Sequence, residues 1–267
     1  MKRDLLLGFI LLLFVGCESA EDDVFEPEPN VLALMRIGYS SPPSLRRQRI
    51  KVDRSYDIED TVDRWGLRDA YVKVWGEEDT FIFIDSFFDE DSAKWFKYNE
   101  GNYYEWAYFD DTTLYHLEVA LPWDDTVTAE AMMPTPIRIY TPADSDTVSI
   151  SAEPYDPHVI TWNSCKNTEL YVIYCIPDVD DSLYKNYPNF LFFPSFTNDT
   201  SYAFFLQRML APWIYDEYYV LRVMAVSPEY AAYMGFFGPG EVYSNLSAGY
   251  GMFGGIAEDS VRVFIRE

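Results

Sequence analysis

The sequence predicts an all-β protein built from two β-sandwich domains. The first observation is its high aromatic content, with 22 Tyr, 19 Phe and 7 Trp among 267 residues, because aromatic side chains are enriched in strands. The second is a series of short segments in which apolar and polar residues alternate, and the third is the turn composition between them. With 49% hydrophobic residues, the chain is long enough for about two domains.

The first segment predicts export and lipid attachment. Lys2 and Arg3 precede an apolar run, Leu5 to Val15, which is shorter than the roughly 20 residues that cross a bilayer. The run ends in Phe-Val-Gly-Cys17, which resembles the lipobox of bacterial lipoproteins. The resemblance implies that residues 1–16 are a signal peptide, and that acyl chains on Cys17 hold the protein on a membrane.

Residues 17–30 are predicted to form an extended tether. They contain Glu-Asp-Asp and Glu-Pro-Glu-Pro, and both proline and like charges extend a chain. Ser19 to Asp23 also resembles the acidic signal by which some Gram-negative bacteria send a lipoprotein from the outer membrane to the cell surface. The alternative is a solvated linker on a periplasmic lipoprotein.

Alternating segments predict the strands of the first sandwich, residues 31–150. In the segment from Thr113 to Leu121, Tyr115, Leu117 and Val119 face one side while His116 and Glu118 face the other. Residues 70–75 and 80–83 flank a Gly-Glu-Glu-Asp turn and predict a hairpin. The further strands expected here are residues 31–37, 49–58 and 126–132.

Turn-rich segments at 140–146 and 153–157 predict the boundary of a second sandwich, residues 151–267. A Trp162-bearing strand (158–163), a loop and a strand at 169–176 resemble the B and C strands of fibronectin type III-like sandwiches. That resemblance places Trp162 and one face of the second strand in a second core. Residues 218–226 predict a later strand, 202–210 a short helix or strand, and 227–234 a helix capped by Ser227.

Cys165 and Cys175 are predicted to be unbridged, with at least one of them buried. The chain between them is mostly extended, which separates their Cα atoms by more than the roughly 7 Å that a disulfide allows.

The C-terminal segment from Ser244 to Gly255, SNLSAGYGMFGG, resembles the ending of an uncharacterised family of bacterial lipoproteins. The resemblance implies a lipobox, an immunoglobulin-like sandwich, a fibronectin type III-like sandwich and association with TonB-dependent outer-membrane receptors. Read from the residues, the glycines favour a close-packed closure of the second domain. The alternative is a ligand groove lined by Tyr243, Asn245 and Tyr250.

Charge and motifs disfavour several functions, although 44 Asp and Glu residues leave a hydrolase with a carboxylate pair as a third alternative. The net charge of −24 disfavours nucleic acid and other polyphosphate partners. The chain has only two histidines, His116 and His158, and no GxSxG motif, so no catalytic residue is assigned. No cofactor or metal site is predicted, because the acidic loops at 89–91 and 178–182 lack the EF-hand pattern.

Two features favour binding. A basic cluster at residues 46–54 is either a solvated strand face or a patch for phosphates or an acidic partner. Aromatic residues crowd the segment from 95 to 109, where alternation buries about half and leaves the rest for a glycan or a protein. The candidates are Trp95, Tyr103, Tyr104 and Trp106.

The expected function is therefore that of a non-catalytic lipoprotein of the outer membrane, on the cell surface, assisting a TonB-dependent β-barrel receptor in capture or uptake. The alternative is a free-standing adhesin or carbohydrate-binding lipoprotein.

Overall fold

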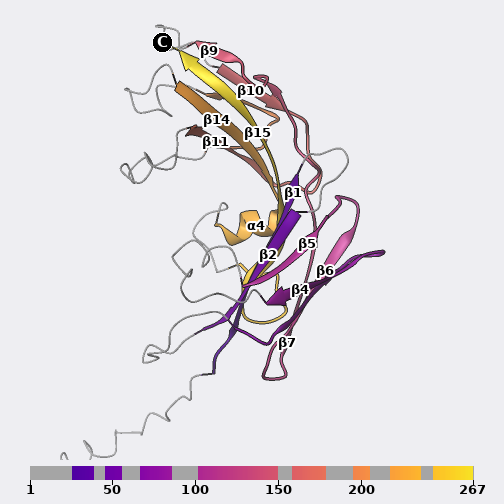
Figure 1. Ribbon diagram of the computed structural model, residues 1–267. Coiled ribbons are helices and arrows are strands. Elements are labelled where there is room, and N and C mark those ends of the chain that lie inside the picture. The colour runs from indigo at the N-terminus through magenta and orange to yellow at the C-terminus, as the bar shows by residue number, and fades with distance from the viewer. Residues whose placement is uncertain are drawn as a thin grey trace, which may run out of the picture.

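The computed structural model confirms the all-β prediction. It describes residues 26–38, 46–55, 67–85, 102–149, 158–178, 195–204, 217–235 and 243–266, which form strands and one short helix (Figure 1). The elements of the N-terminal half are β1 (Pro29–Gly38), β2 (Arg46–Arg54), β3 (Tyr71–Trp75), β4 (Thr80–Asp85), β5 (Tyr103–Ala107), β6 (Leu114–Ala120) and β7 (Thr126–Met132). Those that follow are β8 (Ile139–Thr141), β9 (Thr147–Ser149), β10 (His158–Trp162), β11 (Leu170–Pro177), β12 (Ser195–Thr197), β13 (Ser201–Phe204), β14 (Glu217–Val226), α4 (Pro228–Tyr233) and β15 (Tyr250–Arg266).

The strands form one large twisted sheet and one small sheet. The large sheet has the order β12-β11-β14-β15-β1-β2-β5-β4-β3-β6-β7, with β9 added beside β15. The small sheet has the order β13-β10-β8. In Figure 1 the large sheet curves along the whole molecule, and α4 lies on its hollow side.

β15 is the strand that joins the two halves of the molecule. Its first half runs parallel to β1, from the pair Asn30 and Tyr250 to the pair Gly38 and Glu258. Its second half runs antiparallel to β14, and its last residues pair with β9. The glycine-rich ending was expected to close the second domain, but it instead pairs with the first strand of the N-terminal half.

Local patterns predicted most of the N-terminal strands correctly. β3 and β4 form the expected hairpin. In β6, Tyr115, Leu117 and Val119 are buried while His116 and Glu118 lie on the other side. These strands have one apolar face, and a strand alternates its side chains between faces, so the pattern is readable without tertiary information.

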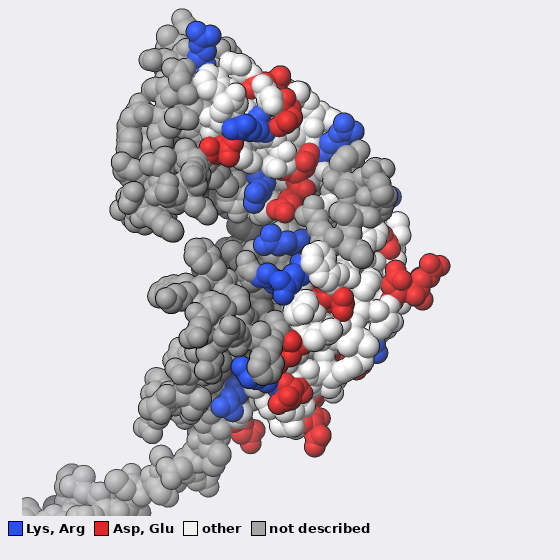
Figure 2. Space-filling model, in the orientation of Figure 1, with Lys and Arg blue, Asp and Glu red and all other residues white. Residues whose placement is uncertain are grey.

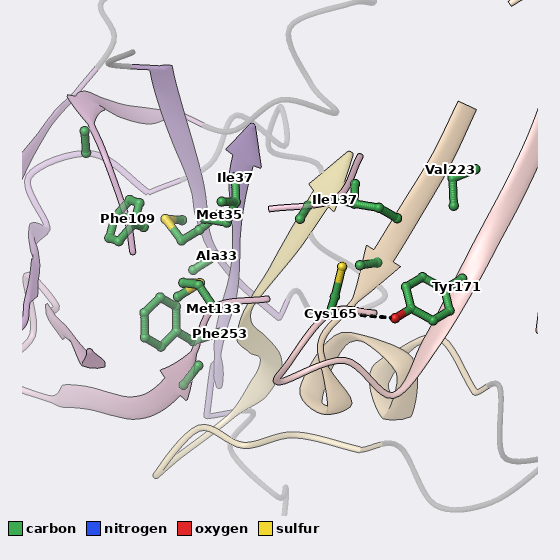
Figure 3. Close-up of a cluster of buried hydrophobic side chains, with 14 of the residues drawn as sticks. Ala33, Met35, Ile37, Phe109, Met133, Ile137, Cys165, Tyr171, Val223 and Phe253 are labelled. Carbon is green, nitrogen blue, oxygen red and sulfur yellow. Dashed lines mark hydrogen bonds between the residues drawn. The ribbon is translucent and has the colours of Figure 1, made fainter. Parts of the chain in front are cut away.

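Most of the buried apolar side chains form one contiguous cluster that crosses both halves. Met35, Met133 and Phe253 pack with Ile137, Tyr171 and others in this cluster, and Figure 3 shows the two groups meeting around the β1 and β15 ribbons. The expected second core around Trp162 is part of it, with Trp162 edge-on to Tyr171 at a centroid distance of 5.4 Å.

A smaller apolar cluster lies beneath α4. It joins Ala231 of the helix to Leu170, Val172 and Val226, and to Ile256 of β15. The helix is the one predicted from its cap: the Ser227 side chain accepts from the Tyr230 backbone N–H, and Pro228 opens the first turn.

Both cysteines of the second half are free and buried, as predicted. The hydroxyl of Tyr171 accepts a hydrogen bond from the Cys165 backbone N–H at 2.8 Å, shown as a dashed line in Figure 3.

The structure corrects the start of the first strand. β1 begins at Pro29 rather than at Val31, because the last two residues of the predicted tether, Pro29 and Asn30, pair with β2.

The division into two domains at residue 150 stays a prediction. β8 and β9 precede that residue but pair with β10 and β15, which follow it.

Cys17, Trp95 and the loop at 89–91 lie outside the described residues. Within the described part of the chain, no helix is long and apolar enough to cross a membrane.

Candidate binding face

Basic and aromatic residues meet on β2 and β5, on the face of the sheet that is turned away from the main core and that carries α4 on neighbouring strands. Gln48 and Ile50 of β2 point into the core, so the alternation of the strand turns Arg47 and Arg49 outward. In the antiparallel register Arg47 lies opposite Trp106, and Arg49 lies opposite Tyr104. We call these four residues the Arg–aromatic face.

The side chains of this face contact one another. The guanidinium carbon of Arg47 lies 4.2 Å from the ring centroid of Tyr104, within the range of a cation–π interaction. Trp106 is 55% exposed. Large aromatic rings that remain exposed are typical of interaction surfaces.

Tyr103 does not belong to this face, although the sequence made it a candidate. It is 1% exposed, and its hydroxyl donates to the Leu67 carbonyl and accepts from the Ala70 N–H. Burial raises the pKa of Tyr103 to about 12. This tyrosine is a core residue that fixes the loop before β3.

Arg36 of β1 extends the basic face through a buried glutamine. The Gln48 side chain accepts from the Arg36 backbone N–H at 2.9 Å and donates to the Arg36 carbonyl at 2.9 Å. It also approaches the Ala107 carbonyl at 3.5 Å. Gln48 therefore ties β1, β2 and β5 together and holds Arg36 beside the Arg–aromatic face.

The arginines are close enough to affect one another. The pKa of Arg49 is lowered first by burial and then by the positive charges of Arg47 and Arg36. This positive cluster sits in a chain whose net charge is −24. In Figure 2, Lys and Arg side chains lie next to one another midway along the molecule, in the region where Figure 1 places β1 and β2.

Exposed apolar side chains continue the face away from the arginines. Ile84 of β4 lies opposite Tyr104 and is 57% exposed. Ile82 and Tyr71, on the same side of β4 and β3, are 48% and 46% exposed. On this side of the sheet, the exposed side chains thus change from basic on β2 to apolar on β4.

The basic cluster and the aromatic cluster were each predicted from the sequence as candidate binding residues. The sequence did not indicate that β2 and β5 are neighbours, nor that Arg36, Gln48 and Ile84 belong to this region. The pairing of β2 with β5 is set by contacts between distant segments, so no local signal revealed it. The only local signal for Arg36 and Ile84 was strand alternation, which turns both residues away from the core. Alternation does not indicate which of the residues turned away from the core bind a ligand.

The candidates near the C-terminus divide into two kinds. Tyr243 and Tyr250 are 38% and 47% exposed. Asn245, by contrast, makes structural hydrogen bonds: it accepts from the Phe253 N–H at 2.9 Å and donates to the Phe253 carbonyl at 2.8 Å and the Glu130 carbonyl at 3.2 Å. Its amide therefore connects β15 to β7 and is occupied by the fold.

The histidine of β6 makes surface contacts. His116 pairs with Glu130 across β6 and β7 at 3.0 Å and stacks on Trp75 at a centroid distance of 5.2 Å. Lys73 lies over the same Trp75 ring at 4.1 Å. The contacts of His116 with Trp75 and Glu130 are cross-strand pairs of the kind that stabilise sheets, whereas Lys73 and Trp75 are neighbours on one side of β3.

No group of three or more potential metal ligands occurs among the described residues. Of the acidic loop at 178–182, the described part is Asp178, whose carboxylate pairs with Arg262. The rest of that loop lies outside the described residues.

Neither a protein-family model nor a curated protein matches the sequence. Among solved structures, the chain is similar to the fibronectin(III)-like modules of Clostridium thermocellum CbhA, with 9% identity over 89% of this chain and 94% of that chain. The TM-score is 0.26, so this similarity supports no inference about function. The class of protein that fold and face define is an all-β sandwich protein with an exposed basic and aromatic strand face.

Proposed function

We propose that this protein is a non-catalytic lipoprotein of the outer membrane that captures a ligand for a TonB-dependent receptor. The observation that carries the proposal is the lipobox ending at Cys17. The glycine-rich ending, which resembles that of lipoproteins accompanying such receptors, supplies the choice of partner. The fibronectin type III-like and immunoglobulin-like character of the two sandwiches belongs to the same proposal.

The position of β1 fits a tethered capture protein. The first strand begins at Pro29, and an extended chain from Cys17 to that residue reaches at most about 40 Å. This length places the sheet within reach of a partner in the same membrane. We expect the acidic and proline-rich composition of residues 17–30 to favour an extended tether.

The experiment is a pull-down of the lipidated protein from its own outer membrane in mild detergent, followed by mass spectrometry. A β-barrel receptor recovered in stoichiometric amount is the expected result, and Cys17→Ala should abolish the co-purification. Recovery of the lipidated protein alone would contradict the receptor partnership.

A second candidate function is that of a carbohydrate-binding lipoprotein that acts without a receptor. The exposed Trp106 ring beside Tyr104 favours it, because aromatic rings provide flat apolar surfaces with a polar rim for recognition. Glycan binding by the purified chain, with no receptor recovered in the pull-down, would favour this candidate over the first.

A further inference from the structure

The two end strands of the large sheet differ in how their edges are protected. Within the described residues, the sheet ends in β12 on one side and in β7 on the other. An end strand presents backbone N–H and C=O groups that can pair with a strand of another chain, and a very short strand offers few of them. β12 has three residues. β7 has seven, TVTAEAM, without a proline, so its edge needs another form of protection.

The outer edge of β7 is formed by the backbone groups of alternate residues. β7 pairs with β6 over the full length of both strands. In an antiparallel pair, each residue turns both of its backbone groups either toward the partner strand or away from it. The N–H and the carbonyl of Thr128 both bond to Ser247, so they point away from β6. By the same alternation, the backbone groups of Thr126 and Glu130 also face the outer edge.

Residues 244–247, which we call the edge guard, cover this edge. The Ser247 N–H donates to the Thr128 carbonyl at 2.8 Å, and the Thr128 N–H donates to Ser247 Oγ at 2.8 Å. The side-chain amide of Asn245 donates to the Glu130 carbonyl at 3.2 Å. The guard therefore occupies both outward groups of Thr128 and the carbonyl of Glu130, although it is not itself a strand.

The edge guard is anchored to the rest of the fold. The Asn245 amide that reaches β7 also accepts from the Phe253 N–H and donates to the Phe253 carbonyl, so it is bound to β15. Leu246 packs against the main core. Of the bonds to β7, those of Ser247 Oγ and of the Asn245 amide come from side chains. A loop bound in this way covers an edge without offering a new one on which the sheet could continue.

We propose that the edge guard keeps the protein monomeric by blocking antiparallel pairing of β7 with β7 of a second copy. This role is independent of the proposed function, since it involves neither the anchor at Cys17 nor the Arg–aromatic face. Loss of the receptor partnership and loss of the guard are therefore separate results.

A second copy fits the edge of β7. Two identical antiparallel strands can pair about a two-fold axis, so that the same groups meet from both sides. The side chains of β7 that face the core are small, and the exposed Thr126 and Thr128 are β-branched, as is typical of cross-strand pairs. The small core-facing residues are Val127, Ala129 and Ala131.

The experiment is sedimentation equilibrium of the full lipidated chain in excess detergent whose density the buffer matches, over a range of protein concentrations. The wild type should be monomeric. Asn245→Ala with Ser247→Ala should form a dimer with at least about tenfold tighter self-association, because two bonds to β7 and the bonds to Phe253 are lost. The matched control is Asn198→Ala with Thr200→Ala, an exposed amide and hydroxyl between β12 and β13, which should behave as the wild type.

A third substitution locates the association. Thr128→Pro, added to the double guard variant, removes an N–H from the outer edge of β7 and leaves the bonds to β6, which come from the alternate residues. The triple variant should return to the self-association of the wild type. Near-ultraviolet circular dichroism checks that each variant is folded.

Three results would overturn the inference: a wild type that is itself a dimer, a folded double variant that is as monomeric as the wild type, and a dimer that Thr128→Pro leaves equally tight. The last would place the association on another surface. Should the double variant be unfolded, Ser247→Ala alone replaces it. This single variant leaves Asn245 in place and should tighten self-association about fivefold, and the same three results apply to it.

Discussion

Gln48 is the residue whose buried amide aligns three strands. We expect Gln48→Leu, which keeps the size but not the amide, to lower the free energy of unfolding by about 1–3 kcal/mol, because the Arg36 N–H and carbonyl lose their partner. Urea denaturation measures the change. Glu77→Gln, in the exposed turn after β3, is the control and should stay within about 0.5 kcal/mol of the wild type. An unchanged midpoint for Gln48→Leu would show that β1 and β2 are aligned without this amide.

Two buried tyrosines predict a loss of stability at high pH. Burial raises the pKa of Tyr103 and of Tyr115 to about 12 in the folded state, against about 10 in the unfolded chain. Their contribution is therefore complete below about pH 10 and is lost as the pH rises from there toward 12. Above about pH 10 each should remove about 1 kcal/mol of stability per pH unit.

The measurement is urea denaturation at intervals from pH 8 to 11.5. Tyr103→Phe should reduce the slope of the fall above pH 10 by about 1 kcal/mol per pH unit, whatever its effect at pH 8, because phenylalanine cannot ionise while Tyr115 and the two buried thiols still can. Tyr140→Phe, at an exposed position of β8, should keep the wild-type slope. A Tyr103→Phe variant with the full wild-type slope would mean that other groups cause the alkaline loss.

At the scale of elements, glycines allow β15 to lie against β1. Gly251 has φ of 124°, and a Cβ added there would lie 1.9 Å from the Val31 carbonyl oxygen. Backbone cannot move aside as a side chain can, so we expect Gly251→Ala to lower the free energy of unfolding by more than about 3 kcal/mol. The comparison is Gly235→Ala, whose φ is also positive at 71° but whose added Cβ meets nothing within 4 Å.

That comparison separates backbone strain from the contact between strands. Gly235→Ala should cost only the roughly 1–2 kcal/mol of a left-handed alanine. The difference between the two variants, measured by urea denaturation, reports the closeness of β15 to β1. Equal losses would show that the parallel pairing tolerates a side chain at Gly251.

The elements that the sequence predicted are those whose signal is local. Alternation identified β6, and cap chemistry identified α4 with its Ser227 N-cap. The parallel pairing of β1 with β15 joins residues more than 200 positions apart, and no local pattern encodes it. In β5, aromatic residues occupy both faces, so alternation alone left open that Tyr103 faces the core and Trp106 the solvent.

At the scale of the whole molecule, β15 predicts that the two halves unfold together. This strand pairs with β1 on one side and β14 on the other, and one contiguous core crosses both halves. We expect a single cooperative transition in urea, with near-ultraviolet circular dichroism and tryptophan fluorescence giving the same midpoint. Two separated transitions would mean that the halves are stable alone and that β15 links them only loosely.

The number of thiols that react with Ellman's reagent tests two properties of the whole molecule: the acylation of Cys17 and the burial of Cys165 and Cys175. Burial raises the pKa of the Cys165 thiol to about 11 and that of the Cys175 thiol to about 12, and only the thiolate reacts quickly. The folded protein at pH 8 should therefore show almost no reaction with Ellman's reagent. In denaturant two thiols should react, because both cysteines are free and an acylated Cys17 contributes none.

Variants assign each thiol. Cys165→Ala should leave one reactive thiol in denaturant, while Cys17→Ala should leave two and release the protein from the membrane fraction. A third thiol in the denatured wild type, removed by Cys17→Ala, would show that Cys17 carries no acyl chain and would remove the anchor from the proposed function. Fewer than two, restored by a reductant, would instead reveal a disulfide and contradict the separation of Cys165 from Cys175. One thiol titration thus tests both predictions: Cys17→Ala reports whether Cys17 is acylated, and Cys165→Ala reports whether Cys165 and Cys175 are unbridged.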